Sequence, residues 1–131
     1  MCKINILSYY FIMLPKEYRL KKRTAFSATY RTGKSFHKDG ITVFCGKKKA
    51  KEIPTKIGFV VSKKIHKRAV KRNRMKRLMR ESLRIYIKNS GINFDTAYIS
   101  LVFVGSSKLL TKDFKQINTS MKKLMGMIEN A

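Results

Sequence analysis

The fold is decided by the stretch IGFVVSKKIHKRAVKRNRMKRLMRESLRIYIK, residues 57–88. It opens with the apolar run 57–61, whose β-branched and aromatic residues are typical of a buried strand. A basic loop follows over 62–68, and apolar side chains then recur at helical spacing from 69 to 88. A strand that leads through a loop into a long amphipathic helix predicts a helix that packs on a sheet.

The predicted helix has two sides of opposite chemistry. At 100° per residue, the apolar residues gather on one side and the cationic residues on the other. The apolar side consists of Met75, Leu78, Met79, Leu83 and Tyr86, and the cationic side of Asn73, Arg74, Lys76, Arg77, Arg80 and Arg84. Solvated helices normally mix charges of both signs, but here Glu81 is the one acid within 68–84. This side therefore predicts an anionic partner.

A shorter helix is predicted over residues 24–32. Phe26 and Tyr30 lie one turn apart on it, Thr24 is an acceptable N-cap, and Gly33 provides a stop at the C-terminal end.

Strand signals lie on both sides of the central unit. Upstream, the pair Asp39-Gly40 predicts a turn and the run 41–45 predicts a strand, before a basic loop over 46–54. Downstream, the apolar run 96–104 predicts another strand. The chain then returns to helical spacing.

The last helix is predicted to begin near Thr111, which would cap it, with Asp113 in the first turn. Its apolar side would be Phe114, Ile117, Met121, Leu124, Met125 and Ile128. The elements then follow the order helix, strands, helix, strand, helix. That order predicts an α+β or split-βαβ sandwich.

Charge dominates the composition. The 131 residues include 31 Lys and Arg against 7 Asp and Glu, which gives a net charge of +24. Such a charge repels itself, and affinity for nucleic acid grows with each phosphate neutralised. A nucleic acid is therefore the first choice of partner, ahead of an anionic membrane or an acidic protein.

No pattern for protein-based catalysis is present in the sequence. The acidic residues are scattered, without the paired carboxylates of a metal-dependent nuclease, and there is no glycine-rich phosphate loop or nucleophile elbow. Cys2 and Cys45 form no CxxC pair and have no histidine partners at zinc spacing. We therefore expect a binding protein without a bound metal, in a reduced, cytoplasmic setting.

The N-terminal fourteen residues are apolar but too short to span a bilayer, and they make a poor signal peptide. We therefore divide the chain into an apolar extension, 1–12, and one RNA-binding domain, 13–131. Translation that starts at Met13 would explain the extension equally well.

Several motifs in order resemble the bacterial ribonuclease P protein family. These are RNRMKRLMRE at 72–81, GFVVSKK at 58–64, LPKEYRL at 14–20, and Phe26 followed by YRTGKSF at 30–36. The resemblance covers about residues 13–127, and its specificity rests on the combination.

The resemblance implies an αβββαβα sandwich, like domain 2 of ribosomal protein S5, with a left-handed βαβ crossover that departs from the general rule. It implies a subunit of a ribonucleoprotein endonuclease whose RNA holds Mg²⁺ and cuts the bond. The protein would bind the ribonuclease P RNA and the 5′ leader of precursor tRNA, with no membrane or small-molecule partner and no catalytic residue.

The resemblance also assigns residues to each partner. The RNA subunit would contact Lys63, Lys64, Arg68, Arg72, Asn73, Arg74, Lys76, Arg77 and Arg80, and the leader cleft would be lined by Phe26, Tyr30 and Phe44. From spacing alone, these aromatic residues fit core packing better than base stacking. Asp39 departs from the family, which often has a basic or neutral residue in this turn.

Other functions fit the composition as well. A ribosomal RNA-binding protein would show the same charge, so only the order of motifs favours ribonuclease P. A duplex-DNA architectural protein is less favoured, because dimerisation heptads and helix-turn-helix spacing are absent. A membrane-active helix would need an apolar side that is not used in the core.

Overall fold

A computed structural model describes residues 19–49, 55–90 and 98–129. The elements are α2 (Arg23–Arg31), β1 (Lys34–Lys38), β2 (Ile41–Cys45), β3 (Lys56–Val60), α3 (Ala69–Ser90), β4 (Ser100–Gly105), the 3₁₀ helix η2 (Ser107–Thr111) and α4 (Phe114–Glu129). The strands form one sheet in the order β1-β2-β4-β3. β4 runs antiparallel to β2 and parallel to β3, so the sheet is mixed. The predicted α+β class and αβββαβα order are confirmed.

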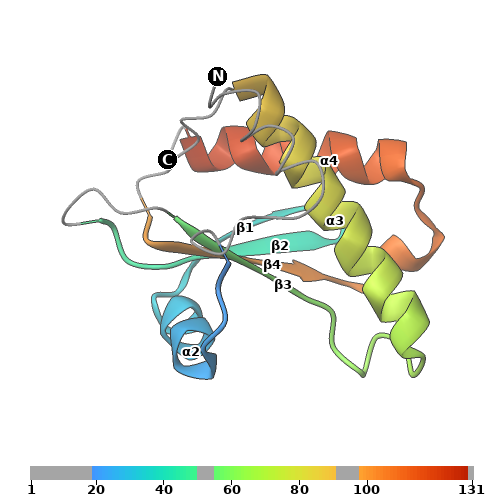
Figure 1. The fold of residues 1–131 in the computed structure, drawn as a ribbon, viewed down its shortest axis with the longest axis horizontal. Coiled ribbons are helices and arrows are strands. Elements are labelled where there is room, and N and C mark those ends of the chain that lie inside the picture. Colours follow the sequence, from blue (N-terminus) through green and yellow to red (C-terminus); the bar gives the residue numbers. More distant parts are fainter. Residues whose placement is uncertain (1–18, 50–54, 91–97, 130–131) are drawn as a thin grey trace, which may run out of the picture.

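The helices lie on both faces of this sheet. Figure 1 shows α3 and α4 together on one face and the short α2 on the other. Side chains alternate along β2, where Ile41, Val43 and Cys45 are buried while Thr42 and Phe44 are half-buried. The buried set faces the α3–α4 layer, and the half-buried set faces the side that carries α2.

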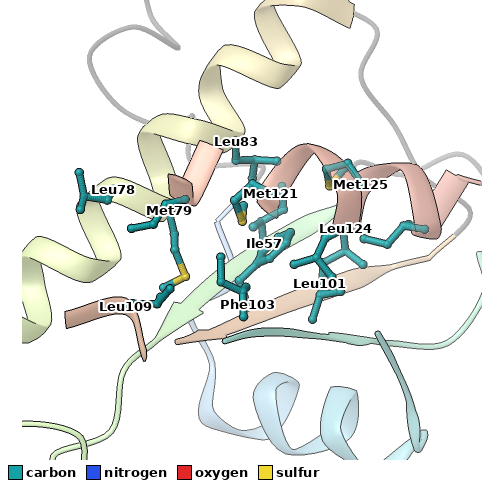
Figure 2. Close-up of a cluster of buried hydrophobic side chains, with 14 of the residues drawn as sticks. Ile57, Leu78, Met79, Leu83, Leu101, Phe103, Leu109, Met121, Leu124 and Met125 are labelled. Atoms are coloured by element: carbon teal, nitrogen blue, oxygen red, sulfur yellow. The ribbon is translucent and has the colours of Figure 1, made fainter. Parts of the chain in front are cut away.

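The core lies between the sheet and the α3–α4 layer. Figure 2 shows Met79 and Leu83 of α3 and Leu124 of α4 above Leu101 and Phe103 of β4. All five are 0% exposed, and each buried side chain of this kind stabilises the fold by about 1.5–3 kcal/mol. The predicted apolar sides of α3 and α4 are therefore confirmed as the core.

The β1–β2 connection is the turn predicted at Asp39-Gly40. Both residues have positive φ, 50° and 90°, as two-residue hairpins require. The Asp39 carboxylate accepts a hydrogen bond from Ser120 Oγ of α4 at 3.2 Å. Its charge is thus turned toward α4 and away from the face that carries α2.

Two predicted helix caps are wrong. α2 begins at Arg23, with Lys22 at the N-cap and no side-chain cap bond, so Thr24 lies inside the helix. Thr111 ends η2, and α4 is capped instead by Asp113. Asp113 Oδ1 accepts from the Gln116 amide at 2.9 Å, and Gln116 Oε1 accepts from the Asp113 amide at 3.1 Å. This reciprocal pair is a capping box, whose D-x-x-Q spacing is visible in the sequence.

Most predicted boundaries differ from the structure by one or two residues. β3 begins one residue earlier than predicted, and α3 continues to Ser90. Of the strand predicted at 96–104, β4 covers 100–105 and Tyr98 forms an isolated bridge to Lys48, while residues 96 and 97 lie outside the described ranges. The extension 1–12 also lies outside them, and the handedness of the β3–α3–β4 crossover stays a prediction.

Candidate nucleic-acid interface

The cationic side of α3 is opposite the core. Asn73, Arg77 and Arg80 are exposed at spacings of four and three residues, while the neighbouring Arg74 and Lys76 are half-buried. Side chains at these spacings lie along one line on a helix. The helix therefore presents a row of donors away from its buried apolar side, and at Arg80 this row passes close to the edge strand β3. We call these five residues the α3 stripe.

The basic loop 62–68 has a defined local structure. The Lys64 amide donates to Ser62 Oγ at 3.1 Å, and the Ile65 amide donates to the Ser62 carbonyl at 3.0 Å. The Arg68 amide donates to His66 Nδ1 at 3.0 Å. Within this turn, Lys63 and Lys64 are exposed, as is Arg68, so all three predicted loop residues are available to a ligand.

Arg72 differs from the stripe in its contacts. Its Nη1 donates to the carbonyl of His66 at 2.8 Å and to that of Lys67 at 2.7 Å. The side chain is half-buried and points back to the loop. The structure thus places eight of the nine predicted RNA-contacting residues on the α3 stripe and the loop, and places Arg72 between the two.

Arg80 packs against aromatic rings, a contact that was not predicted from the sequence. Its guanidinium carbon lies 5.7 Å from the centroid of the Phe59 ring, a cation–π distance. Phe59 in turn stacks on the buried Phe103 at 5.5 Å, with 18° between the ring planes. A guanidinium near an aromatic ring can still donate its N–H groups to phosphate. Residues 59 and 80 are too far apart in sequence for spacing to reveal this pair.

The three predicted leader-binding aromatics come together where α2 crosses the sheet. Phe44, Val102 and Gly58 are aligned across β2, β4 and β3. Tyr30 meets Phe44 edge-to-face at 5.0 Å, and Phe26 lies over Gly58, where an added Cβ would be 2.6 Å from two ring atoms. One turn of α2 thus crosses one face of the sheet, from β3 under Phe26 to β2 beside Tyr30. We call Phe26, Tyr30 and Phe44 the aromatic row.

The attachment of α2 to the sheet adds polar contacts to these aromatic ones. Thr29 is its one buried residue, and its Oγ1 lies 2.6 Å from Ser100 Oγ of β4. Thr32 Oγ1 donates to the carbonyl of Cys45. Around these contacts, Phe26 and Phe44 are half-buried and Tyr30 is 38% exposed.

The next row of the same sheet face was not predicted. The strand register aligns His37, Thr42, Val104 and Val60 across the four strands. The last three are half-buried, and the exposed His37 lies with Nδ1 2.8 Å from Thr42 Oγ1. Thr42, Val104 and Val60 each lie two positions from Phe44, Val102 or Gly58, and this spacing is the signal in the sequence that could have identified them. From Val60 the chain runs directly into the basic loop.

Burial raises the pKa of two groups near these aromatic residues. It raises the pKa of Tyr30, and it raises the pKa of the Cys45 thiol to about 11, so that thiol stays protonated at neutral pH. Across the described ranges, no three His, Cys, Asp or Glu side chains gather as metal ligands. The helices of those ranges include none that is long and apolar enough to cross a membrane.

Known proteins share both the sequence and the fold. A family model described as Ribonuclease P matches residues 14–129. The ribonuclease P protein component of a Synechococcus species is 33% identical over 115 residues, which cover 86% of this chain and 83% of the relative. That of Clostridium kluyveri is 36% identical over 110 residues, covering 82% and 91%.

Solved structures of ribonuclease P proteins have the same fold as this chain. The RNase P protein of Staphylococcus aureus matches with a TM-score of 0.71 over 88% of this chain and all of that one; at 24% identity this shows the fold alone. The RNase P protein of Thermotoga maritima matches with a TM-score of 0.65 and 25% identity, over 86% and 96%. The chain therefore belongs to the ribonuclease P protein family, and it acts in tRNA processing as a component of ribonuclease P.

Proposed function

We propose that the α3 stripe and the basic loop bind the catalytic RNA of ribonuclease P. The observation that carries this proposal is the position of the stripe, which lies outside the apolar side of α3 that packs in the core. Because the core uses the other side, the arginines can face a large partner without any change of fold. Arginine forks match phosphate oxygens bidentately, and Asn73 can reach a base edge or a ribose.

We further propose that the aromatic row binds the single-stranded 5′ leader of precursor tRNA. Tyr30 and Phe44 offer ring surface to unpaired bases, and stacking of this kind contributes about 1–3 kcal/mol per base. The half-buried row at Thr42, Val104 and Val60 extends this surface toward the basic loop. A leader RNA bound there would pass from the aromatic rings to the cations proposed to bind the RNA subunit.

In this proposal the two subunits divide the work. The RNA subunit holds the Mg²⁺ ions and cuts the phosphodiester bond, while the protein positions the substrate and neutralises phosphates. The residues that the structure brings together suit this division, because they are cations, amides and aromatic rings. Such groups bind RNA through charge and stacking.

The test is cleavage of a precursor tRNA by a bacterial ribonuclease P RNA at low magnesium, with and without this protein. We expect strong stimulation by the protein. Changing Arg74, Arg77 and Arg80 together to Ala should abolish most of that stimulation, because three phosphate contacts are lost.

The matched control changes Lys115, Lys122 and Lys123 of α4 to Ala. These lysines are exposed, and the net charge falls by the same amount. Equal losses in the two triple variants would mean that total charge, and not the α3 stripe, drives binding. No stimulation by the unchanged protein, despite tight RNA binding, would contradict the proposed function itself.

A further inference from the structure

Arg72 has contacts that set it apart from the cations of the α3 stripe. Both of its hydrogen bonds go to the protein itself, to the carbonyls of His66 and Lys67 at 2.8 and 2.7 Å. We infer that Arg72 is a positioning residue, which fixes the loop 62–68 in the shape that presents its lysines to RNA. The inference rests on the proposed binding of the RNA subunit.

The position of Arg72 on the helix agrees with this role. It precedes Met79 by seven residues, so the two side chains leave α3 within roughly 20° of each other. Met79 is buried in the core, whereas the stripe residue Arg77 lies on the other side of the helix. Arg72 therefore leaves α3 on its core side, in the first turn, where the loop arrives.

The loop needs such a contact because of its own charge. Lys63, Lys64, Lys67 and Arg68 lie within six residues, and all four are exposed. Like charges at this density favour an extended, open chain. The carbonyls of His66 and Lys67 also lie close enough to share one nitrogen, and a cation offsets the repulsion between their oxygens.

The remaining loop bonds are local and weak by comparison. They join Ser62 to Lys64 and Ile65, and His66 to Arg68, each within three residues. The Arg72 side chain, in contrast, joins the first turn of α3 to two carbonyls of the loop, five and six residues earlier in the chain. Its loss should therefore free the loop without disturbing the core.

The test is the salt dependence of binding to a bacterial ribonuclease P RNA. Each phosphate contact contributes about one unit to the slope of log affinity against log salt. Arg77→Ala, the matched control, should lower the slope by about one. Arg72→Ala should lower the slope by about two to three, since the cations of the freed loop lose their phosphate contacts.

A double-mutant cycle separates positioning from direct contact. In the unchanged protein, the joint change Lys63→Ala and Lys64→Ala should weaken binding clearly, on the order of tenfold or more, since two phosphate contacts are lost. In the Arg72→Ala background the same change should have little further effect. In the Arg77→Ala background its effect should be undiminished.

Hydrogen exchange provides a readout that RNA binding does not enter. In free Arg72→Ala protein, the amides of Ile65 and Arg68 should exchange faster, while that of Leu83 in the core keeps its protection. Arg72→Lys retains the charge but lacks the planar fork. It should leave the slope below that of the unchanged protein.

Other outcomes overturn the inference. A slope that falls by about one in Arg72→Ala, with effects that add to those of the loop lysines, would make Arg72 a direct phosphate contact. The same conclusion would follow if Arg72→Lys had the full salt slope of the unchanged protein. A failure of the proposed function looks different, because the unchanged protein would then bind this RNA no better than an equally basic control protein.

Discussion

The two faces of the sheet are used in opposite ways. The face under α3 and α4 is closed by side chains that are wholly buried, among them Leu83, Leu101 and Phe103. The other face carries α2 and the neighbouring Leu20 in the described ranges, and that helix is attached through the Thr29–Ser100 hydrogen bond and through Phe26 over Gly58.

The difference gives most of the stability to one face and, in the proposed function, leaves the other for binding. A closed apolar face supplies most of the free energy of folding, because burial scales with the apolar area removed from water. The open face can then leave Tyr30 and Phe44 half-exposed without loss of the fold. The α3 stripe can be polar for the same reason, since its residues lie outside the side of α3 that is buried in the core.

The largest expected effect is on the closed face. Leu83→Ala should lower the free energy of unfolding by about 2–5 kcal/mol, because it leaves a cavity in a packed core. Val104→Ala, on the open face, removes a half-buried side chain and should cost roughly 1 kcal/mol or less. Urea denaturation measures both. Equal losses would mean that the two faces do not differ in this way.

The next effect is at the contact between α2 and the sheet. Gly58→Ala should cost about 1–3 kcal/mol, because the new methyl group would lie 2.6 Å from Phe26 ring atoms and must displace α2. It should also weaken the preference for precursor over mature tRNA. Gly126→Ala in α4 is the control, since nothing lies within 4 Å of the added carbon. If Gly58→Ala keeps the preference for precursor tRNA, the packing of Phe26 on Gly58 does not shape the leader site.

A smaller effect concerns the rings themselves. Phe44→Leu keeps an apolar side chain but loses the aromatic surface, so leader affinity should fall by about 1–2 kcal/mol, while mature tRNA binding stays unchanged. Competition binding to the assembled holoenzyme, with precursor and mature tRNA, measures the difference. Phe114→Leu, half-buried against the core, is the matched change on the closed face and should leave both affinities as they were.

The smallest effect is at the start of α4. Asp113→Ala removes the cap and should lower the free energy of unfolding by about 1 kcal/mol, without any change in leader affinity. Asp113→Asn retains an acceptor and should stay close to the unchanged protein. Thr111→Ala should have little effect, since Thr111 is not the cap. Thermal unfolding of the three variants decides whether the capping box is real.

Much of the fold could be predicted because local patterns and tertiary structure agree. The periodicity of residues 69–88 and 114–128 gave the helices and their buried sides, and Asp39-Gly40 gave the hairpin turn. The strand β1 was found only through the family order, because its sequence KSFHK is mostly exposed and polar. The N-caps were misassigned because Thr24 and Thr111 are good cap residues at positions where the backbone does not begin a helix.

The sequence by itself determined the cationic side of α3, the aromatic residues and the order of elements, since these follow from periodicity and residue type. Only the tertiary structure decided which of these residues act together. Phe26 reaches Gly58, Arg80 reaches Phe59, and Arg72 turns to the loop carbonyls rather than to the α3 stripe. Contacts of this kind depend on how α2 and α3 are placed on the sheet. That placement is set by packing between segments far apart in the chain, which no local pattern records.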